Sequence, residues 1–168
     1  DQIIHGDETV TLLKDHVVLE EEGEAPLAMV RKRRPGRVGP PVLLVHGFAQ
    51  NRYSWHLSRR SLTAWLAARG YDTWNLELRG HGRSREVAAG GSVGAEDFAD
   101  YVNDIVRVAG ALPGPAFWIG HSLGGAALYG AATQASGRAR PRGVIGIGAL
   151  YRFGQANKLL NALGRLTH

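Results

Sequence analysis

Short apolar runs alternate along this chain with longer segments in which apolar residues recur at helical spacing. Residues 42–45 (Val-Leu-Leu-Val) are apolar at every position, which is typical of a strand buried on both faces. Helical spacing follows over residues 58–69, strand-like sequence over 71–78, and a clear apolar stripe over 98–109. Parallel strands need crossover connections, which helices usually provide. The alternation therefore predicts an α/β fold with a mostly parallel sheet flanked by helices.

Apolar patterns and chain breakers predict the remaining strands, loops and helices of the chain. Before the breaker Arg34-Pro35-Gly36, alternating sequence predicts strands over residues 10–13, 17–21 and 27–33. The later segments are expected to be a glycine-punctuated loop over 79–84, a strand over 116–119, a helix over 123–134, a strand over 143–150 and one more helix over 157–166. No linker divides the chain, so we expect one domain over residues 1–168.

Composition excludes several classes of protein. No run approaches the roughly 18 apolar residues of a membrane-spanning helix, so we expect no transmembrane segment. The chain has no cysteine, which excludes disulfides, thiolate zinc sites and a cysteine nucleophile. It also lacks a phosphate-binding P-loop, an H-E-x-x-H helix and a G-x-G-x-x-G motif. We therefore expect no cofactor and no metal.

The positive net charge raises the question of nucleic acid. The formal charge is +5 and the isoelectric point is near 10.0. Acidic residues gather over 1–24, however, and the basic run over 31–37 follows them directly, so the two blocks largely cancel. The basic run also lacks the interleaved aromatic residues of single-strand binders. We interpret it as a solvated edge and expect no nucleic-acid partner.

The most informative motif is Gly120-His121-Ser122-Leu123-Gly124, which matches G-x-S-x-G between an expected strand and an expected helix. A sharp strand-to-helix turn strains the central residue and lifts its hydroxyl clear of the sheet, and flanking glycines let strand and helix approach closely. The motif makes Ser122 the candidate nucleophile.

A second motif supplies the other half of the expected site. Val45-His46-Gly47-Phe48 ends the buried strand at 42–45, and the backbone N–H of Phe48 is our candidate oxyanion donor. The second donor is the N–H of Leu123, at a helix N-terminus that favours negative charge. His46 is expected to anchor this loop, and His121 to pack beside the elbow.

These motifs, with Arg79-Gly80-His81-Gly82-Arg83-Ser84 between them, resemble the α/β-hydrolase superfamily, and specifically its lipase and esterase branches. The resemblance covers roughly residues 9–155 and implies that Ser122 forms an acyl-enzyme. Polyhydroxyalkanoate synthases are also similar but carry cysteine at this position. Epoxide hydrolases and haloalkane dehalogenases have aspartate at this position, so the serine argues against membership of these two branches. The resemblance also implies that residues 151–168 begin a cap or linker region.

The resemblance leaves the site incomplete. The superfamily's triad runs in the order serine, acid, histidine. The 46 residues after Ser122 contain no aspartate or glutamate, and their only histidine is the terminal His168. Of the earlier groups, His81 is read as structural and Glu77 as a poor fit to the family's acid. Three aspartates are interpreted as a solvated helix face: Asp97, Asp100 and Asp104. The last strands, the cap, the acid and the histidine are therefore expected on a companion C-terminal segment or chain of the same protein.

The expected function is that of a serine hydrolase that cleaves carboxylic esters through an acyl-enzyme on Ser122. Its partner would be an ester or lipid-like small molecule, and Tyr53 and Trp55 are candidates to line the acyl pocket. Two alternatives stay open: an acyltransferase that uses the same serine, and a non-catalytic binding or scaffold subunit that keeps the elbow without a base. A bacterial cytoplasmic location is the default expectation.

Overall fold

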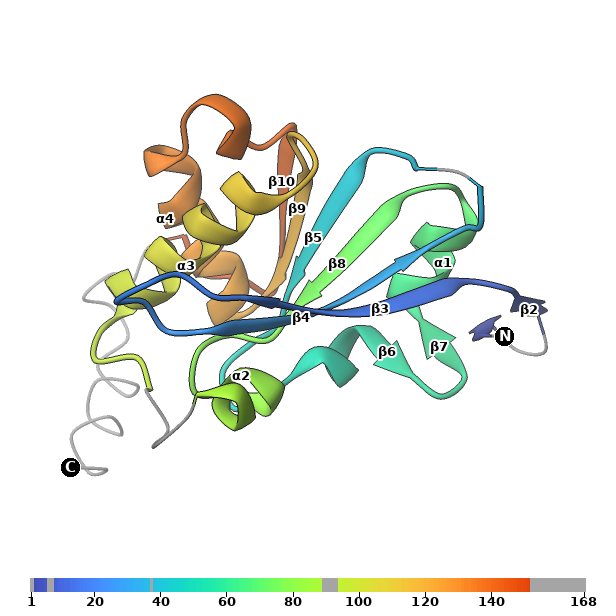
Figure 1. Ribbon diagram of the computed structural model, residues 1–168, viewed down its shortest axis with the longest axis horizontal. Coiled ribbons are helices and arrows are strands. Elements are labelled where there is room, and N and C mark those ends of the chain that lie inside the picture. Colours follow the sequence, from blue (N-terminus) through green and yellow to red (C-terminus); the bar gives the residue numbers. More distant parts are fainter. Residues whose placement is uncertain (1, 6–7, 37, 89–93, 152–168) are drawn as a thin grey trace.

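A six-stranded mixed sheet organises the molecule (Figure 1). The computed structural model describes residues 2–5, 8–36, 38–88 and 94–151. The strands lie in the order β10-β9-β5-β8-β4-β3. Their bounds are β3 Leu13–Leu19, β4 Leu27–Arg33, β5 Pro41–Val45, β8 Asp72–Leu76, β9 Phe117–His121 and β10 Gly143–Ile147. The four strands β8, β5, β9 and β10 run parallel, while β4 is antiparallel to β8 and to β3. The expected mostly parallel α/β sheet is confirmed.

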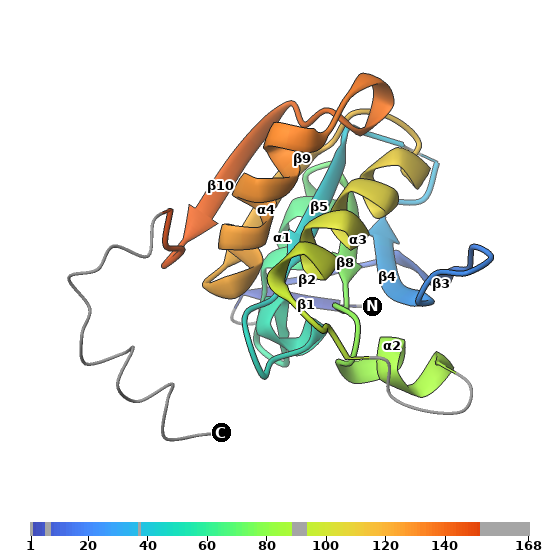
Figure 2. The same cartoon turned by 90° about the vertical axis from the view of Figure 1, so that its left-hand side faces the viewer.

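Helices cover both faces of this sheet (Figure 2). Helices α3 (Phe98–Ala111) and α4 (Leu123–Gln134) pack on each other and on one face, where they enclose the larger apolar core with Leu43, Leu76 and Trp118. Helix α1 (Leu62–Ala68) lies on the other face, over a smaller core of Val42, Leu44, Trp55 and Ile119. Every side chain of β5 and β8 is buried, as expected of central parallel strands.

Local sequence explains where the helices begin. Ser61 precedes α1, and its hydroxyl accepts the backbone N–H of Ala64. Asp97 precedes α3, and its carboxylate accepts the backbone N–H groups of Ala99 and Asp100, while the carboxylate of Asp100 accepts the N–H of Asp97 in return. These side chains satisfy N–H groups that a first helical turn leaves unpaired.

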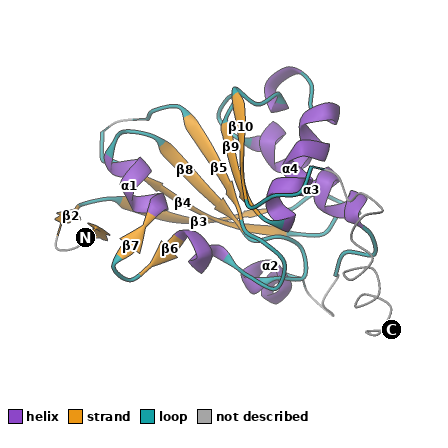
Figure 3. Cartoon of the chain, turned by 180° about the vertical axis from the view of Figure 1, so that it is seen from behind, coloured by secondary structure: helices purple, strands orange, loops and turns teal. Residues whose placement is uncertain are grey.

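A second, four-stranded sheet was not expected from the sequence (Figure 3). It has the order β2-β1-β7-β6, with β1 Gln2–His5, β2 Glu8–Val10, β6 His56–Leu57 and β7 Arg60–Ser61. The expected strand over 10–13 is therefore wrong, because residues 8–10 and 13–19 belong to strands of two different sheets. The expected helix over 58–69 likewise begins only at Leu62, since the antiparallel strands β6 and β7 occupy the residues before it.

The glycine-punctuated segment after β8 also differs from expectation. Residues 82–87 form the short helix α2 (Gly82–Val87), so the expected loop over 79–84 is partly helical. The Ser84 hydroxyl donates to the backbone oxygen of Glu77 and accepts the N–H of Ala28. This serine joins the ends of β4 and β8, two segments far apart in the sequence.

The aspartates of α3 do not all face solvent. Asp104 is fully buried and accepts two hydrogen bonds of 2.6 Å from the Arg79 guanidinium. It also accepts a 3.1 Å bond from Arg107, which in turn pairs with Glu21. The solvated interpretation is wrong for Asp104, because only the fold brings two arginines onto this carboxylate.

In the described part of the chain, no helix is both long and apolar enough to cross a membrane. The expected helix at 157–166 lies outside the described residues, and so does His168.

Candidate active site

Ser122 occupies a strained turn between β9 and α4. Its φ is 49° and its ψ is −118°, a conformation that costs a non-glycine residue about 1–3 kcal/mol. The backbone N–H of Ser122 donates to the oxygen of Ile147 at 2.9 Å, which ties the turn to the end of β10. A serine at this position usually caps the helix with its side chain, but Ser122 makes no capping bond to α4. Its hydroxyl is therefore not committed to the local structure.

Two glycines permit this turn. A Cβ at Gly124 would overlap the backbone oxygen of His46 and lie 2.7 Å from that of Val45, so α4 could not approach β5. A Cβ at Gly120 would lie 2.6 Å from the backbone nitrogen of Gly125. Both obstacles are backbone atoms, which cannot rotate away, and glycine is the residue that fits such close approaches. Gly120 and Gly124 thus hold the place that the motif predicted for them.

The His46-Gly47-Phe48 segment lies directly beside the serine. Gly47 is buried, and a Cβ on it would lie 3.2 Å from the Cβ of Ser122. The segment turns back at Ala49, whose φ of 55° is unusual for a residue with a side chain. The N–H of Gln50 closes the turn on the oxygen of Gly47 at 3.3 Å. The side chain of Phe48 projects outward and is 72% exposed.

The Gly47–Phe48 peptide has a fixed direction. The oxygen of Gly47 accepts from Nδ1 of His46 at 2.8 Å and from the N–H of Gln50. Since the described chain has no cis peptide, the N–H of Phe48 points away from that oxygen. The N–H of Leu123 is the first of α4 and has no acceptor within the helix. The oxyanion roles of Phe48 and Leu123 remain predictions, and this geometry is compatible with them.

His46 is held as a neutral imidazole. It is fully buried, Nδ1 donates to the Gly47 oxygen, and Nε2 accepts the backbone N–H of Leu78 at 3.1 Å. Burial lowers the pKa of His46 to about 4, since the charged form loses its hydration. Both ring nitrogens are occupied by backbone partners. His46 therefore orients the loop and is unsuited to accept a proton from Ser122.

The other described histidines do not supply a base with an acid behind it. His81 packs against the His46 ring at 5.2 Å, and its Nδ1 faces the backbone oxygen of Arg79 at 2.9 Å. His121 faces the side-chain oxygen of Gln50. Glu77, buried beneath α2, pairs with Arg52 at 2.7 Å. Within the described residues, no acid–histidine pair is joined to Ser122.

Gln50 is a site residue that sequence reasoning missed. Its Oε1 lies 2.9 Å from the N–H of Gly47, 3.0 Å from Nδ1 of His121 and 3.2 Å from Oγ of Ser54. One side-chain oxygen thus joins the His46-Gly47-Phe48 segment, the predicted oxyanion loop, to the elbow. No motif marks a lone glutamine three residues after a glycine, so the sequence offered no signal for it.

A small cavity of about 200 Å³ opens beside the elbow. Trp55 and Ile147 form apolar walls, and polar groups come from Gln50, Ser54 and His121. Trp55 lines this cavity, and its role in an acyl pocket stays a prediction. Tyr53 does not line this cavity; the residue is 52% exposed, and the guanidinium of Arg52 lies over its ring.

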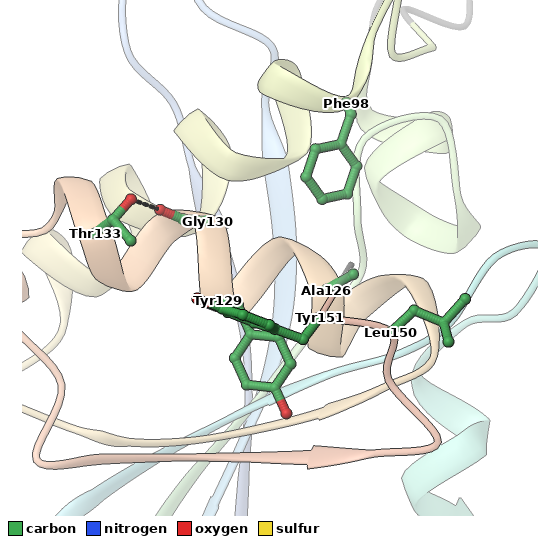
Figure 4. Close-up of a pocket in the computed structure, with 7 residues that line it drawn as sticks. All are labelled: Phe98, Ala126, Tyr129, Gly130, Thr133, Leu150 and Tyr151. Carbon is green, nitrogen blue, oxygen red and sulfur yellow. Dashed lines mark hydrogen bonds between the residues drawn. The ribbon is translucent and has the colours of Figure 1, made fainter. Parts of the chain in front are cut away.

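A larger groove of about 310 Å³ lies along α4 (Figure 4). Phe98 enters it from the start of α3, and Leu150 and Tyr151 enter from the segment after β10. The ring of Tyr129 meets that of Tyr151 edge-on at 5.8 Å. The groove is mostly apolar.

Among the described residues, no cluster of three histidine, aspartate or glutamate side chains is arranged to hold a metal ion.

Comparison with known proteins places these features in one family. A family model described as the alpha/beta hydrolase family matches residues 42–167. Protein phosphatase methylesterase 1 of Mus musculus is 34% identical over 109 residues, which are 64% of this chain and 27% of that protein. Epoxide hydrolase B of Mycobacterium tuberculosis is 35% identical over 91 residues, which are 54% of this chain and 24% of that protein. The chain spans about a quarter of the length of these curated relatives.

Solved structures agree on the fold. A putative epoxide hydrolase from Pseudomonas aeruginosa superposes with a TM-score of 0.57 at 29% identity, over 75% of this chain and 39% of that one. A hydrolase from Pseudomonas aeruginosa PA01 gives a TM-score of 0.64 at 19% identity, over 92% and 53%. The family model covers most of the sequence and includes both the His46-Gly47-Phe48 segment and the elbow. This chain belongs to the alpha/beta hydrolase family.

Proposed function

We propose that this chain carries the nucleophile of a serine hydrolase that cleaves carboxylic esters. The observation that carries the proposal is Ser122 itself, which stands in a strained turn with a hydroxyl that makes no capping bond. A serine that served only the turn would gain stability from a capping bond. Strain retained without that bond is typical of functional positions.

In the proposed reaction, Oγ of Ser122 attacks the ester carbonyl carbon and gives its proton to a base. The negative oxygen of the tetrahedral intermediate is held by the N–H groups of Phe48 and Leu123. The C–O bond then breaks, the alcohol leaves with the proton, and water later hydrolyses the acyl-enzyme. The base and its acid would lie on a companion C-terminal segment, since the described residues pair no histidine with an acid beside Ser122.

Serine favours ester over epoxide chemistry. A carboxylate that opens an epoxide forms an ester, and water can hydrolyse that ester. A serine that opened an epoxide would form an ether, which has no carbonyl for water to attack and no oxyanion to stabilise. The relatives named as epoxide hydrolases therefore support the fold, and the methylesterase among the relatives is the better guide to chemistry.

Labelling with a fluorophosphonate tests the proposal directly. The probe needs an activated serine, and peptide mapping should place the adduct on Ser122 when the companion segment is present, with Ser122→Ala as the control. Hydrolysis of p-nitrophenyl esters should disappear in the same variant. If Ser122→Ala hydrolyses them at the original rate, the proposal is wrong.

Two other outcomes have their own signatures. Dominant transfer of the acyl group to a competing alcohol at low alcohol concentration would make the protein an acyltransferase. A folded protein that carries an intact companion segment but leaves Ser122 unlabelled would be a non-catalytic subunit.

A further inference from the structure

The side-chain oxygen of Gln50 lies between the two motifs that build the site. It is within 3.0 Å of the backbone nitrogen of Gly47 and of Nδ1 of His121, the residue before the nucleophile. Gln50 itself follows the tight turn at Ala49 and closes that turn with its own N–H. Its main chain and its side chain therefore both hold the oxyanion loop.

These bonds identify the atom and the proton involved. A backbone N–H can only donate, so the amide atom that faces Gly47 is the oxygen of Gln50. The same oxygen faces Nδ1 of His121, and an oxygen of this kind can only accept. Nδ1 of His121 must then carry a proton. Gln50 thus selects one tautomer of the imidazole beside the nucleophile.

The direction of the Phe48 N–H depends on the same residue. Gln50 accepts the N–H of Gly47 and donates to its oxygen, so it fixes the glycine from both sides. The position of the Gly47 oxygen sets the plane of the Gly47–Phe48 peptide. The N–H of Phe48 then points the opposite way, because the N–H of a trans peptide points opposite to its C=O. Among the described residues, the buried His46 shares this task, through its own bond to the Gly47 oxygen.

We propose that Gln50 is a positioning residue that holds the oxyanion loop in register with the nucleophile elbow. The inference rests on the proposed function, because its value lies in keeping the Phe48 N–H aimed at the developing oxyanion. An oxyanion donor acts mainly in the transition state, so its misplacement lowers kcat more than it raises KM.

The test compares three variants in the polypeptide that carries the companion segment. Gln50→Leu keeps the volume but removes the acceptor, and we expect kcat for p-nitrophenyl esters to fall about 10- to 100-fold with KM changed less than about threefold. Gln50→Glu keeps an accepting oxygen and should recover most of that loss. Gln134→Leu makes the same exchange at the exposed end of α4 and should leave both constants unchanged.

A second measurement does not depend on activity. In ¹⁵N-labelled protein, the side-chain spectrum of His121 should show a proton on Nδ1 in the wild type and in Gln50→Glu, and a different tautomer balance in Gln50→Leu. A folded Gln50→Leu variant with wild-type kcat and an unchanged His121 spectrum would overturn the inference. If the wild type hydrolyses no ester, the proposed function fails, and the His121 spectrum alone decides whether Gln50 forms the bridge.

Discussion

At the scale of single residues, the buried imidazole of His46 makes stability depend on pH. Burial lowers its pKa from 6.5 to about 4 in the folded chain, so the unfolded chain binds more protons between these values. Acidification from about pH 6.5 to pH 4 should therefore destabilise the fold, by on the order of 3 kcal/mol from this residue. His56, whose pKa burial also lowers to about 4, acts in the same direction.

Urea unfolding at pH 7 and pH 5 checks this prediction. His46→Gln should be less stable than the wild type at pH 7, because it loses one of two backbone bonds, yet lose less stability on acidification. The exposed His16 is the control: slight burial, with Lys14 and Arg83 nearby, also lowers its pKa, so His16→Gln should lose part of the wild-type difference but keep more of it than His46→Gln. An equal pH dependence in His46→Gln and the wild type would contradict the prediction.

The buried carboxylate of Asp104 makes a second prediction. It has no exposed surface and accepts from both Arg79 and Arg107. Asp104→Asn removes the buried carboxylate that both guanidinium groups share and leaves them only their more exposed acidic partners, so it should lower the free energy of unfolding by about 3 kcal/mol. Asp100 pairs with Arg79 at 3.3 Å and is more exposed than Asp104. Asp100→Asn should therefore lower the free energy of unfolding by less. Chemical denaturation of both variants measures the two losses in free energy of unfolding. Equal losses would show that the burial of Asp104 adds nothing to its contribution to stability.

At the scale of elements, α4 can lie against the sheet only because of Gly124. A methyl group there would overlap the backbone of His46, so Gly124→Ala must push α4 away from β5. We expect a loss of more than about 3 kcal/mol. Gly110, in α3, has nothing within 4 Å of an added Cβ, and Gly110→Ala should stabilise the helix by up to about 1 kcal/mol. Thermal unfolding measures both variants, and a tolerated Gly124→Ala would contradict the close-packing argument.

How much the sequence predicts also depends on the element. The central strands and α3 were predictable, because their signals are local: continuous apolar runs and a 3.6-residue apolar stripe. The elbow was predictable because its glycines recur at fixed spacing around Ser122. The small N-terminal sheet was not, since its strands are two to four residues long and pair across the chain, as His5 does with Arg60.

The same distinction applies to the site. Ser122 and the two predicted oxyanion donors lie within recognisable motifs, whereas the side-chain oxygen of Gln50 reaches His121 only in the folded loop. The burial of Asp104 was hidden for a similar reason, because its arginine partner Arg79 lies 25 residues earlier. Long-range polar pairs of this kind leave no periodic trace in a sequence.

At the scale of the whole molecule, the sheet ends on a parallel edge. Within the described residues, β10 pairs with β9 alone, and Ile145 is 54% exposed on one face of it. Val144, the neighbouring residue, packs against the main core on the opposite face. An unpaired apolar edge strand is a template for association with another chain.

This edge predicts how the isolated chain behaves in solution. Ile145→Lys places a charge on the exposed face and should reduce concentration-dependent association, while the free energy of unfolding changes by less than about 1 kcal/mol. Val144→Lys places the same charge at a half-buried position that packs against the core, and should lower the free energy of unfolding by more than Ile145→Lys does. Light scattering over a dilution series, with denaturation curves for each variant, measures both effects. If Ile145→Lys associates as strongly as the wild type, the β10 edge is not the contact, and the apolar groove beside α4 becomes the surface to vary next.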